Sequence, residues 1–317
     1  MEAQTHGTAG IATDDASAQN IATNACQTEH ISGQKNRETP RYKVVRRRSD
    51  IGYGFYLFFK RCFDIVSSIL LFLVLCLPLG IILLVKWAED ATKPLYRLSI
   101  EDIPEGEPCD KKAPDVYRAR DGKLVRCTLV PMSKEEEHKA RTEAKEKGEK
   151  ISTKPWYTST RVGKDGKTFR MLKIRTMLPN AEGMKQQLID AGLNETDEHF
   201  FKMEKDPRIT KVGRFLRKFS IDELLQLLNI IKGDLSVIGP RSPLPNEVEK
   251  YNEYERQRLL VKGGLLCLWQ IQHNRNSISF DEWVRLDLEY IEKQSFLLDM
   301  KILFKGAWMV LFDHSGQ

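Results

Sequence analysis

One stretch of the sequence, residues 65–85, reads IVSSILLFLVLCLPLGIILLV and constrains how the rest of the chain can fold. It carries no charge and lies between Asp64 and Lys86. A helix of this length rises about 31 Å at ~1.5 Å per residue, which matches the hydrocarbon thickness of a bilayer. Core helices of soluble proteins rarely run so far without a polar face, so we expect this segment to lie in a membrane.

Pro78 and Gly80 interrupt this run and bear on its topology. Basic residues before the run favour a cytoplasmic N-terminus. A straight crossing would then export every later residue, although scattered cysteines suit a reducing compartment. Because proline removes a backbone donor and bends a helix, we predict a re-entrant helix-break-helix at Pro78 with both flanks cytoplasmic. Broken backbone at that depth has to be covered by protein.

The composition limits the classes of function. The chain is 41% hydrophobic and 30% charged, which excludes wholesale disorder. A net charge of +6 favours anionic partners, whether nucleic acid, phosphate esters or an acidic membrane surface. The six cysteines form no C-x-x-C pair and the six histidines are dispersed, so neither a zinc site nor a Ser/His triad is predicted.

Composition divides the chain into four segments. Residues 1–50 are predicted to be a disordered polar and basic tail, and residues 51–97 the membrane helix with its flanks. Residues 98–160 form a charged insert, in which 133–150 is predicted to be a solvated helix or a mobile segment. Residues 161–317 are predicted to be the catalytic domain, of α/β or α+β type.

Strand and helix signals mix in this last segment. Asp165-Gly166 predicts a hairpin tip, followed by a strand over 168–174. Helical periodicity is present at 180–190, 221–231, 244–260 and 280–293. The apolar stretch 296–312 is interrupted by charges and either lies in the membrane interface or packs on the core.

Ser220-Ile221-Asp222-Glu223 opens one of these predicted helices. The pattern S-x-x-E is a capping box, with Ser220 as N-cap and Glu223 reaching back. A helix N-terminus also stabilises anions, so Asp222 is predicted to stay ionised at neutral pH and to attack phosphorus or hold a divalent cation. On this helix alone, cap and catalytic group remain alternatives.

Basic residues flank the acidic pair on both sides. Residues 206–218 read DPRITKVGRFLRK, and residues 232–241 read KGDLSVIGPR. Cations beside paired carboxylates are what a phosphate substrate with its metal requires. A nucleic-acid surface would also explain them, although the apolar run makes that reading less attractive.

Ten short motifs follow one another in a fixed order. They are KRCFD (60–64), RVG (161–163), LKIRTM (172–177), DPRIT (206–210), SIDEL (220–224), KGDLSVIGPR (232–241), LWQ (268–270), NRN (274–276), DLEY (287–290) and LDMKI (298–302). In this order they resemble the bacterial sugar transferases known as monotopic phosphoglycosyl transferases, or polyprenyl-phosphate hexose-1-phosphate transferases. The resemblance covers most of the chain apart from the tail and residues 98–160.

The resemblance implies a small α/β (α+β) domain on the cytoplasmic face of the inner membrane, seated by the re-entrant helix and by interfacial amphipathic helices. It implies transfer of a sugar-1-phosphate from a UDP-sugar to polyprenyl (undecaprenyl) phosphate with the help of Mg²⁺. It also implies that the reaction passes through a covalent aspartyl-phosphosugar intermediate and releases UMP. The reaction would be the first membrane step of surface glycan or exopolysaccharide assembly.

Motif positions assign expected roles to individual residues. Asp222 would be the nucleophile, Glu223 would aid metal binding or proton handling, and both would hold the metal. Arg241 resembles the family arginine that contacts phosphate. Four further cations are candidates for the same phosphate cradle, each with an ordinary structural ion pair as an equal alternative: Lys173, Arg175, Arg208 and Arg275.

The sequence departs from the family pattern near these residues. The usual Pro-Arg-Pro turn reads Pro240-Arg241-Ser242-Pro243, and Leu225 replaces a proline that often follows Asp-Glu-Leu. The expected partners are the UDP-sugar, the polyprenyl phosphate and membrane lipid, without nucleic acid and with a homo-oligomer left open. A catalytically inactive membrane scaffold of the same fold is the alternative, and it could tolerate loss of Asp222.

Overall fold

The computed structural model describes residues 51–104, 113, 115–146, 151–194, 201, 203, 205–272 and 278–312. They belong to one compact unit, Val44–Gln317. Helices mix with three small sheets, which have the strand orders β1-β3-β2, β4-β5 and β6-β7. The predicted mixture of helices and strands is therefore confirmed.

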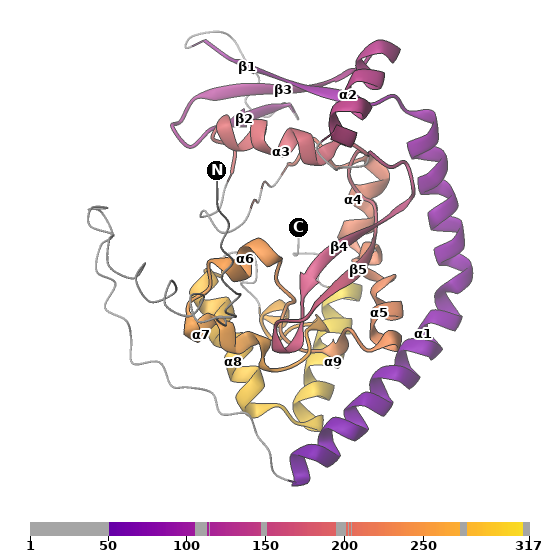
Figure 1. The fold of residues 1–317 in the computed structure, drawn as a ribbon, viewed down its shortest axis with the longest axis vertical. Helices are drawn as coiled ribbons and strands as arrows, with labels where there is room; N and C mark the ends of the chain where they lie inside the picture. Colours follow the sequence, from indigo (N-terminus) through magenta and orange to yellow (C-terminus); the bar gives the residue numbers. More distant parts are fainter. Residues whose placement is uncertain are drawn as a thin grey trace, which may run out of the picture. The chain divides into compact units, whose positions relative to one another are not determined.

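The long N-terminal helix, α1 (Ile51–Thr92), contains the whole apolar run. Figure 1 shows α1 in indigo, bending along its course. The run is helical as predicted, but no break separates two helices, because Pro78 lies inside one continuous helix. A proline removes a single donor, so the turns on either side of it can continue the helix with a bend.

The middle of α1 is exposed. Val74 and Leu77 keep 73% and 74% of their surface accessible. An 18-residue window of the helix has a mean hydropathy of 3.0 and is only 11% buried, whereas the core helix of a soluble protein would be mostly covered. Within the described residues, α1 is the one helix long and apolar enough to cross a membrane.

Polar contacts hold the first part of α1 to the domain. The Asp64 carboxylate accepts hydrogen bonds from Ser236 Oγ (3.1 Å) and from the backbone N–H of Val237 (2.9 Å). Arg61 donates to the carbonyl oxygens of Ile230 (2.6 Å) and Ile231 (2.8 Å). These carbonyls lie in the last turn of α5 (Gln226–Lys232), so Arg61 satisfies groups that a helix C-terminus leaves unpaired.

The second part of α1 is also covered. Leu79, directly after Pro78, is buried in a cluster with Ile174, Leu216 and Leu225. This agrees with the expectation that the backbone around the proline packs against other elements. Directly after the apolar run, the buried Lys86 pairs at 2.7 Å with Asp90, which lies one helical turn further on.

The segment after α1 contains an antiparallel sheet that sequence reasoning did not predict. It consists of β1 (Tyr96–Asp102), β2 (Val116–Arg118) and the central β3 (Leu124–Pro131). Buried side chains of this sheet pack on α3 (Ala181–Asp190), whose Leu188 is fully buried. The following α2 (Lys134–Glu146) has no buried residue, which confirms the predicted solvated helix; residues 147–150 lie outside the described residues.

A hairpin of β4 (Trp156–Val162) and β5 (Thr168–Ile174) follows, and β5 has the predicted bounds. Its tip is the 3₁₀ turn η1 (Lys164–Gly166), where Asp165 and Gly166 take positive φ values of 56° and 77°. Asp and Gly tolerate this conformation, so the predicted D-G tip is confirmed. The Asn229 side chain on α5 bonds to the backbone of Leu172 and Arg170, which fixes α5 along β5.

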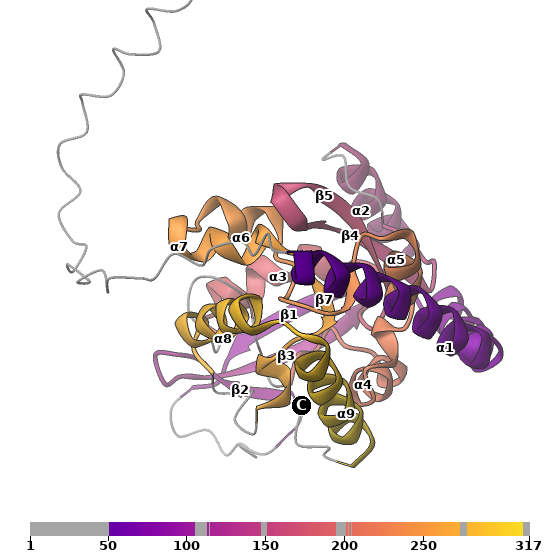
Figure 2. The ribbon, with the colours of Figure 1, turned by 90° about the horizontal axis from the view of Figure 1, so that it is seen from below.

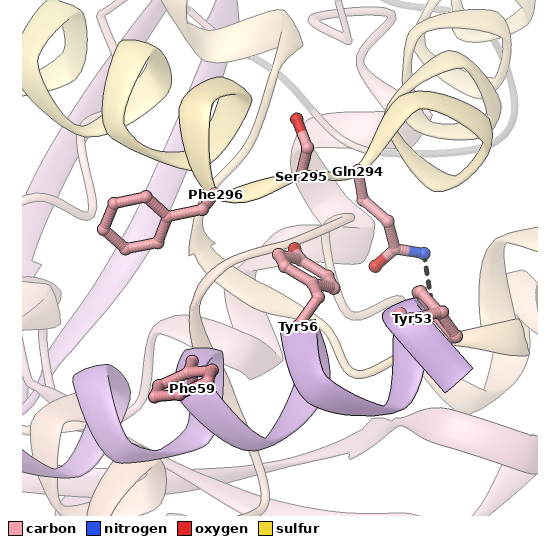
Figure 3. A pocket seen from close by; sticks show the side chains of 7 residues that line it. Tyr53, Tyr56, Phe59, Gln294, Ser295 and Phe296 are labelled. Carbon is pink, nitrogen blue, oxygen red and sulfur yellow. Dashed lines mark hydrogen bonds between the residues drawn. The ribbon is translucent and has the colours of Figure 1, made fainter. Parts of the chain in front are cut away.

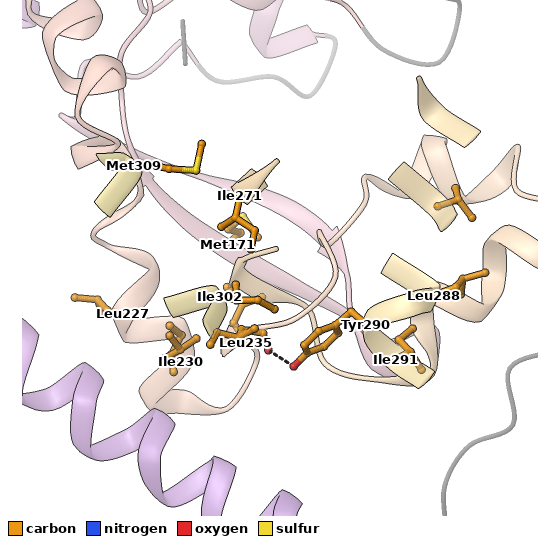
Figure 4. Packing of buried hydrophobic residues seen from close by; sticks show 13 residues of the cluster. Met171, Leu227, Ile230, Leu235, Ile271, Leu288, Tyr290, Ile291, Ile302 and Met309 are labelled. Carbon is orange, nitrogen blue, oxygen red and sulfur yellow. Dashed lines mark hydrogen bonds between the residues drawn. The ribbon is translucent and has the colours of Figure 1, made fainter. Parts of the chain in front are cut away.

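Two buried parallel strands, β6 (Ser236–Ile238) and β7 (Gly264–Leu266), lie at the centre of the largest core cluster. Figure 4 shows this cluster, with Leu235, Ile302 and Tyr290 packed together. The backbones approach closely where β6 ends, because a Cβ added to Gly264 would lie 2.0 Å from the backbone nitrogen of Gly239. Only glycine permits this approach, and it sets the course of the next turn.

The segment between these strands is predicted as one helix over 244–260 and proves to be three short ones. They are α6 (Pro245–Glu249), α7 (Glu253–Arg256) and the 3₁₀ helix η3 (Gln257–Leu260). The interruption has a local cause, because the Asn252 side chain caps α7 by accepting from the N–H of Glu255 at 2.9 Å.

The chain continues through a 3₁₀ turn, η4 (Trp269–Ile271), to α8 (Phe280–Lys293) and α9 (Phe296–Phe312), which are yellow in Figure 2. The predicted helix at 280–293 is confirmed. Of the two alternatives for 296–312, packing on the core is confirmed, and a place in the membrane interface stays a prediction. Ile302 is fully buried, whereas Leu297 remains 81% exposed.

Candidate functional site

The acid pair Asp222-Glu223 lies in a single 3₁₀ turn, η2 (Ile221–Glu223), between α4 (Lys211–Lys218) and α5. The predicted capping box is wrong. Ser220 adopts a left-handed conformation (φ 54°) and its side chain makes no cap hydrogen bond. The backbone N–H of Ser220 instead donates to Arg217 O at 3.0 Å, so Ser220 closes the end of α4. The acid pair therefore lies outside the regular helices α4 and α5.

The side chain of Asp222 is half-buried, and its pKa differs from that of a solvated aspartate. Burial and then the neighbouring Glu223 charge raise its pKa to about 6, against the smaller opposing effects of Lys173 and Arg217. The helix N-terminus that was predicted to keep Asp222 ionised is absent, because the pair lies in one isolated 3₁₀ turn, which supplies little dipole. At pH 7 the carboxylate is still mostly ionised, at about ten to one, and it is more basic than a solvated aspartate.

Glu223 has the opposite environment. Its carboxylate pairs with Lys173 Nζ at 2.7 Å. Burial would raise the pKa of Glu223, but Lys173, Arg241 and Arg161 together lower it. The two adjacent carboxylates therefore differ. Glu223 is held ionised by a lysine, while no described side chain donates to the Asp222 carboxylate.

Two arginines border the pair and form no ion pair with a described residue. Arg241 follows β6 in the Gly-Pro-Arg turn, and its guanidinium lies 5.7 Å from the ring centroid of Trp283. Arg161 Nη1 donates to Ser242 O at 3.2 Å, and its buried Nε has no partner among the described residues. Burial and the charge of Arg241 lower the pKa of Arg161. Two crowded cations that have Glu223 near them but form no ion pair with it are suited to an anionic ligand.

The other cations predicted for the phosphate cradle lie in different environments. Lys173 is at the site, where it pairs with Glu223. Arg208 is buried in an ion pair with Asp206 at 2.6 Å and also donates to Ala181 O, so its structural alternative holds. Arg175 is buried; burial lowers its pKa and Asp90 of α1 opposes this effect. Arg275 lies outside the described residues.

Sequence reasoning assigned no individual role to two cations near the pair, Arg161 in the RVG motif and Arg217 in the basic stretch 206–218. Arg161 stands in the RVG motif, but its approach to Glu223 depends on the hairpin being folded back. Arg217 closes α4 and bonds to Thr176 Oγ1 at 2.9 Å. Its place in the last turn before Ser220 was a signal that could have identified it.

The acid pair also has the chemistry of a magnesium ligand. Within the described residues, no group of three or more His, Cys, Asp or Glu side chains could hold a metal ion. Mg²⁺ does not need one, because it commonly binds through one or two carboxylates, substrate phosphates and several waters. The Asp222 carboxylate, which lacks a side-chain donor and is crowded by Glu223, fits this role.

The fold and the site together define a class of protein. Its members mix helices and strands and have an exposed apolar helix. Their acid pair is bordered by arginines that form no ion pair with a described residue. Residues 149–313 match the model of the family described as bacterial sugar transferase. The match covers more than half of the chain. The chain therefore belongs to the bacterial sugar transferase family.

Curated relatives agree with this assignment. The chain is 44% identical over 155 residues to galactosyl transferase CpsE of Streptococcus agalactiae, which is 49% of this chain and 34% of that protein. It is 41% identical over 157 residues to the undecaprenyl-phosphate galactose phosphotransferase of Salmonella typhimurium (49% and 33%). It is 40% identical over 152 residues to exopolysaccharide production protein ExoY of Sinorhizobium fredii (47% and 67%). The chain spans about a third of the length of the first two.

Proposed function

We propose that this protein transfers a sugar-1-phosphate from a UDP-sugar to a polyprenyl phosphate at the cytoplasmic face of the inner membrane. The observation that carries the proposal is the acid pair Asp222-Glu223 with two arginines near Glu223, Arg161 and Arg241, that form no ion pair with a described residue. The names of the relatives support a galactose-type donor chemistry and a lipid-linked acceptor. The ExoY relatives support a place at the start of exopolysaccharide assembly.

The proposed reaction has two displacement steps. A carboxylate oxygen of Asp222 attacks the β-phosphorus of the UDP-sugar, the bond from that phosphorus to the bridging oxygen breaks, and UMP leaves with the electron pair. A phosphate oxygen of the polyprenyl phosphate then attacks the same phosphorus and displaces Asp222. The products are a polyprenyl diphosphate sugar and the free carboxylate, so atoms and charges balance.

The surrounding residues have separate tasks in this scheme. Arg241 and Arg161 bind the diphosphate and stabilise the charge that develops on its oxygens. Lys173 keeps Glu223 ionised, so that Glu223 does not take a proton from the solvent. When bound by Asp222 and Glu223, Mg²⁺ would neutralise phosphate charge.

We further propose that α1 enters the membrane and returns to the cytoplasmic side. Support comes from the exposed middle of the helix, its bend, and the polar contacts of Arg61 and Asp64 on one side and of Lys86 on the other. Single cysteines at Ile51 and Lys93, in a chain otherwise free of cysteine, should both be protected from an impermeant maleimide added to intact cells. Labelling of one of them from outside would exclude the re-entrant topology.

Substitution of the proposed nucleophile tests the reaction. Asp222→Asn should abolish UMP release from a UDP-sugar, since the amide cannot form the phosphoenzyme. The control is Asp281→Asn, which removes a carboxylate from an exposed position in the first turn of α8. Undiminished UMP release by Asp222→Asn would show that Asp222 is not the nucleophile, whereas a wild-type protein that releases no UMP from any UDP-sugar would favour the inactive scaffold.

A further inference from the structure

A second cationic pocket lies between the first turns of α1 and the tip of the β4–β5 hairpin. Its volume is about 180 Å³. Charged side chains dominate its polar lining, and four of the five are cationic: Lys60, Arg61, Lys164 and Lys262, with Asp64 as the one acid. None of the function proposed above uses this pocket.

The positive charges of the pocket are only partly compensated. Lys60 pairs with Asp299 at 2.7 Å, and Arg61 donates to neutral carbonyl oxygens, so its charge is not cancelled. The ammonium groups of Lys164 and Lys262 form no ion pair and no side-chain hydrogen bond with a described residue. Burial and the charges of Arg61 and Lys164 lower the pKa of Lys262 and outweigh the opposing effects of Asp64 and Asp234, as expected where cations outnumber acids.

The acids near Lys262 already accept hydrogen bonds or form an ion pair with other groups. Asp64 accepts hydrogen bonds from Ser236 and Val237. Asp234, which also faces Lys262, pairs with Lys232 at 3.1 Å. An anionic ligand would therefore meet an excess of positive charge.

This pocket is not the site of the acid pair. The helix α5 begins three residues after Glu223 and ends where Arg61 caps it, a distance of about 10–15 Å along its axis at ~1.5 Å per residue. The strand β5 starts beside the hairpin tip and reaches Lys173 near its other end, roughly 17 Å away at ~3.4 Å per residue. The pocket and the acid pair therefore lie at opposite ends of both α5 and β5.

An aromatic pocket of about 490 Å³ adjoins the cationic one and shares Tyr53 and Gln294 with it. Figure 3 shows Tyr56 and Phe59 of α1 on one side of this space and Phe296 of α9 on the other. Phe59 and Phe296 remain 62% and 51% exposed. Aromatic side chains that are half in water and half covered are typical of the boundary between membrane and water.

We propose that the cationic pocket binds the phosphate of an anionic membrane phospholipid, whose acyl chain lies along the aromatic pocket. Charge complementarity selects the headgroup, and the adjoining apolar space selects a chain over a free phosphate. The lipid contributes no group to the reaction, because Asp222 lies at the far end of α5. It fixes the start of α1 and the α8–α9 junction to the bilayer surface.

Native mass spectrometry of the full chain in detergent tests this proposal, with dioleoyl phosphatidylglycerol and phosphatidylcholine as probes. Lys164→Gln/Lys262→Gln is the informative variant, because neither lysine has a structural partner among the described residues. A lysine near an anionic surface contributes about fivefold in affinity, so the double variant should bind phosphatidylglycerol ~25-fold more weakly. Lys139→Gln/Lys145→Gln on the solvated α2 makes the same change of charge and should bind it as the wild type does.

Further arms separate the sources of phosphate. Phosphatidylcholine and glycerol phosphate should bind weakly, and their lysine dependence should be absent. Equal binding of phosphatidylglycerol by the double variant and the wild type would overturn the proposal. Displacement by an equal concentration of glycerol phosphate, or lysine-dependent binding of undecaprenyl phosphate as tight as that of phosphatidylglycerol, would also overturn it. No arm requires a UDP-sugar, and the Asp222→Asn protein should give the same result, so failure of the proposed transfer reaction would be recognised separately.

Discussion

Asp222→Asn should make the protein more stable at neutral pH while removing its activity. Burial and Glu223 raise the pKa of Asp222 from 3.8 to about 6, so the folded state holds this proton more tightly than the unfolded state. Ionisation of the carboxylate therefore lowers the free energy of unfolding. This loss grows as the pH rises from about 4 to about 6 and stays constant above that. Asparagine never ionises and does not incur this cost.

The shift of about two pKa units sets the size of the effect. Two units correspond to at most about 3 kcal/mol, and solvent screening of a half-buried group reduces this to about 1–3 kcal/mol. For a chain of this size the melting temperature should rise by roughly 2–10 °C at pH 7. At pH 4 the variant and the wild type should melt together.

The assay is thermal unfolding of the purified full chain in detergent with EDTA, followed from pH 4 to pH 8. Glu223→Gln is the matched control of opposite sign, because it leaves Lys173 unpaired and should lower stability at pH 7 by about 1 kcal/mol. Adding Mg²⁺ should raise the melting temperature of the wild type but not of Asp222→Asn, since a ligand stabilises the state that binds it. A difference between Asp222→Asn and wild type that is the same at pH 4 and pH 7 would refute this reasoning.

Three further variants test other parts of the account. Arg241→Gln should raise KM for the UDP-sugar about 10- to 100-fold with little change in melting temperature, because the guanidinium has no ion pair among the described residues; an unchanged KM would remove it from the site. Arg208→Ala should lower stability by about 3–5 kcal/mol, since it leaves the buried Asp206 unpaired, and chemical denaturation measures this; a stable variant with lost donor binding would favour the phosphate cradle instead. Gly264→Ala should unfold or severely destabilise the domain, because its Cβ would meet the backbone of Gly239; a normal circular-dichroism melt would contradict the close approach of β6 and β7.

Local signals predicted well those elements that depend on local chemistry. The strand 168–174, the Asp165-Gly166 tip and the helix 280–293 follow from periodicity and turn residues, and the structure confirms them. The helix predicted over 244–260 failed because Asn252 caps a new helix within it. The sheet β1-β3-β2 lies in a segment rich in charge, where its strands showed no clear alternation of apolar and polar residues.

In the candidate site, too, local sequence predicted some features and only the folded structure revealed the others. Its acid pair and Arg241 lie in recognisable motifs, whereas the environment that sets their pKa values is tertiary. Ser220 carries the sequence of a helix cap but takes a left-handed conformation, so the pKa of Asp222 is set by burial and by Glu223 and not by the predicted helix N-terminus. Arg208 could not be told from a phosphate ligand until Asp206 was found beside it. Arg161 comes near Glu223 only after the hairpin folds onto the domain.

The most direct test of the central claim is the intact mass of the wild-type chain after incubation with a UDP-sugar and Mg²⁺ in the absence of polyprenyl phosphate. A covalent phosphosugar on Asp222 predicts a mass increase equal to one sugar phosphate, located on a peptide that contains Asp222. The adduct should disappear when polyprenyl phosphate is added and should never form on Asp222→Asn. UMP release without any adduct, or an adduct on a peptide that lacks Asp222, would contradict the proposed mechanism.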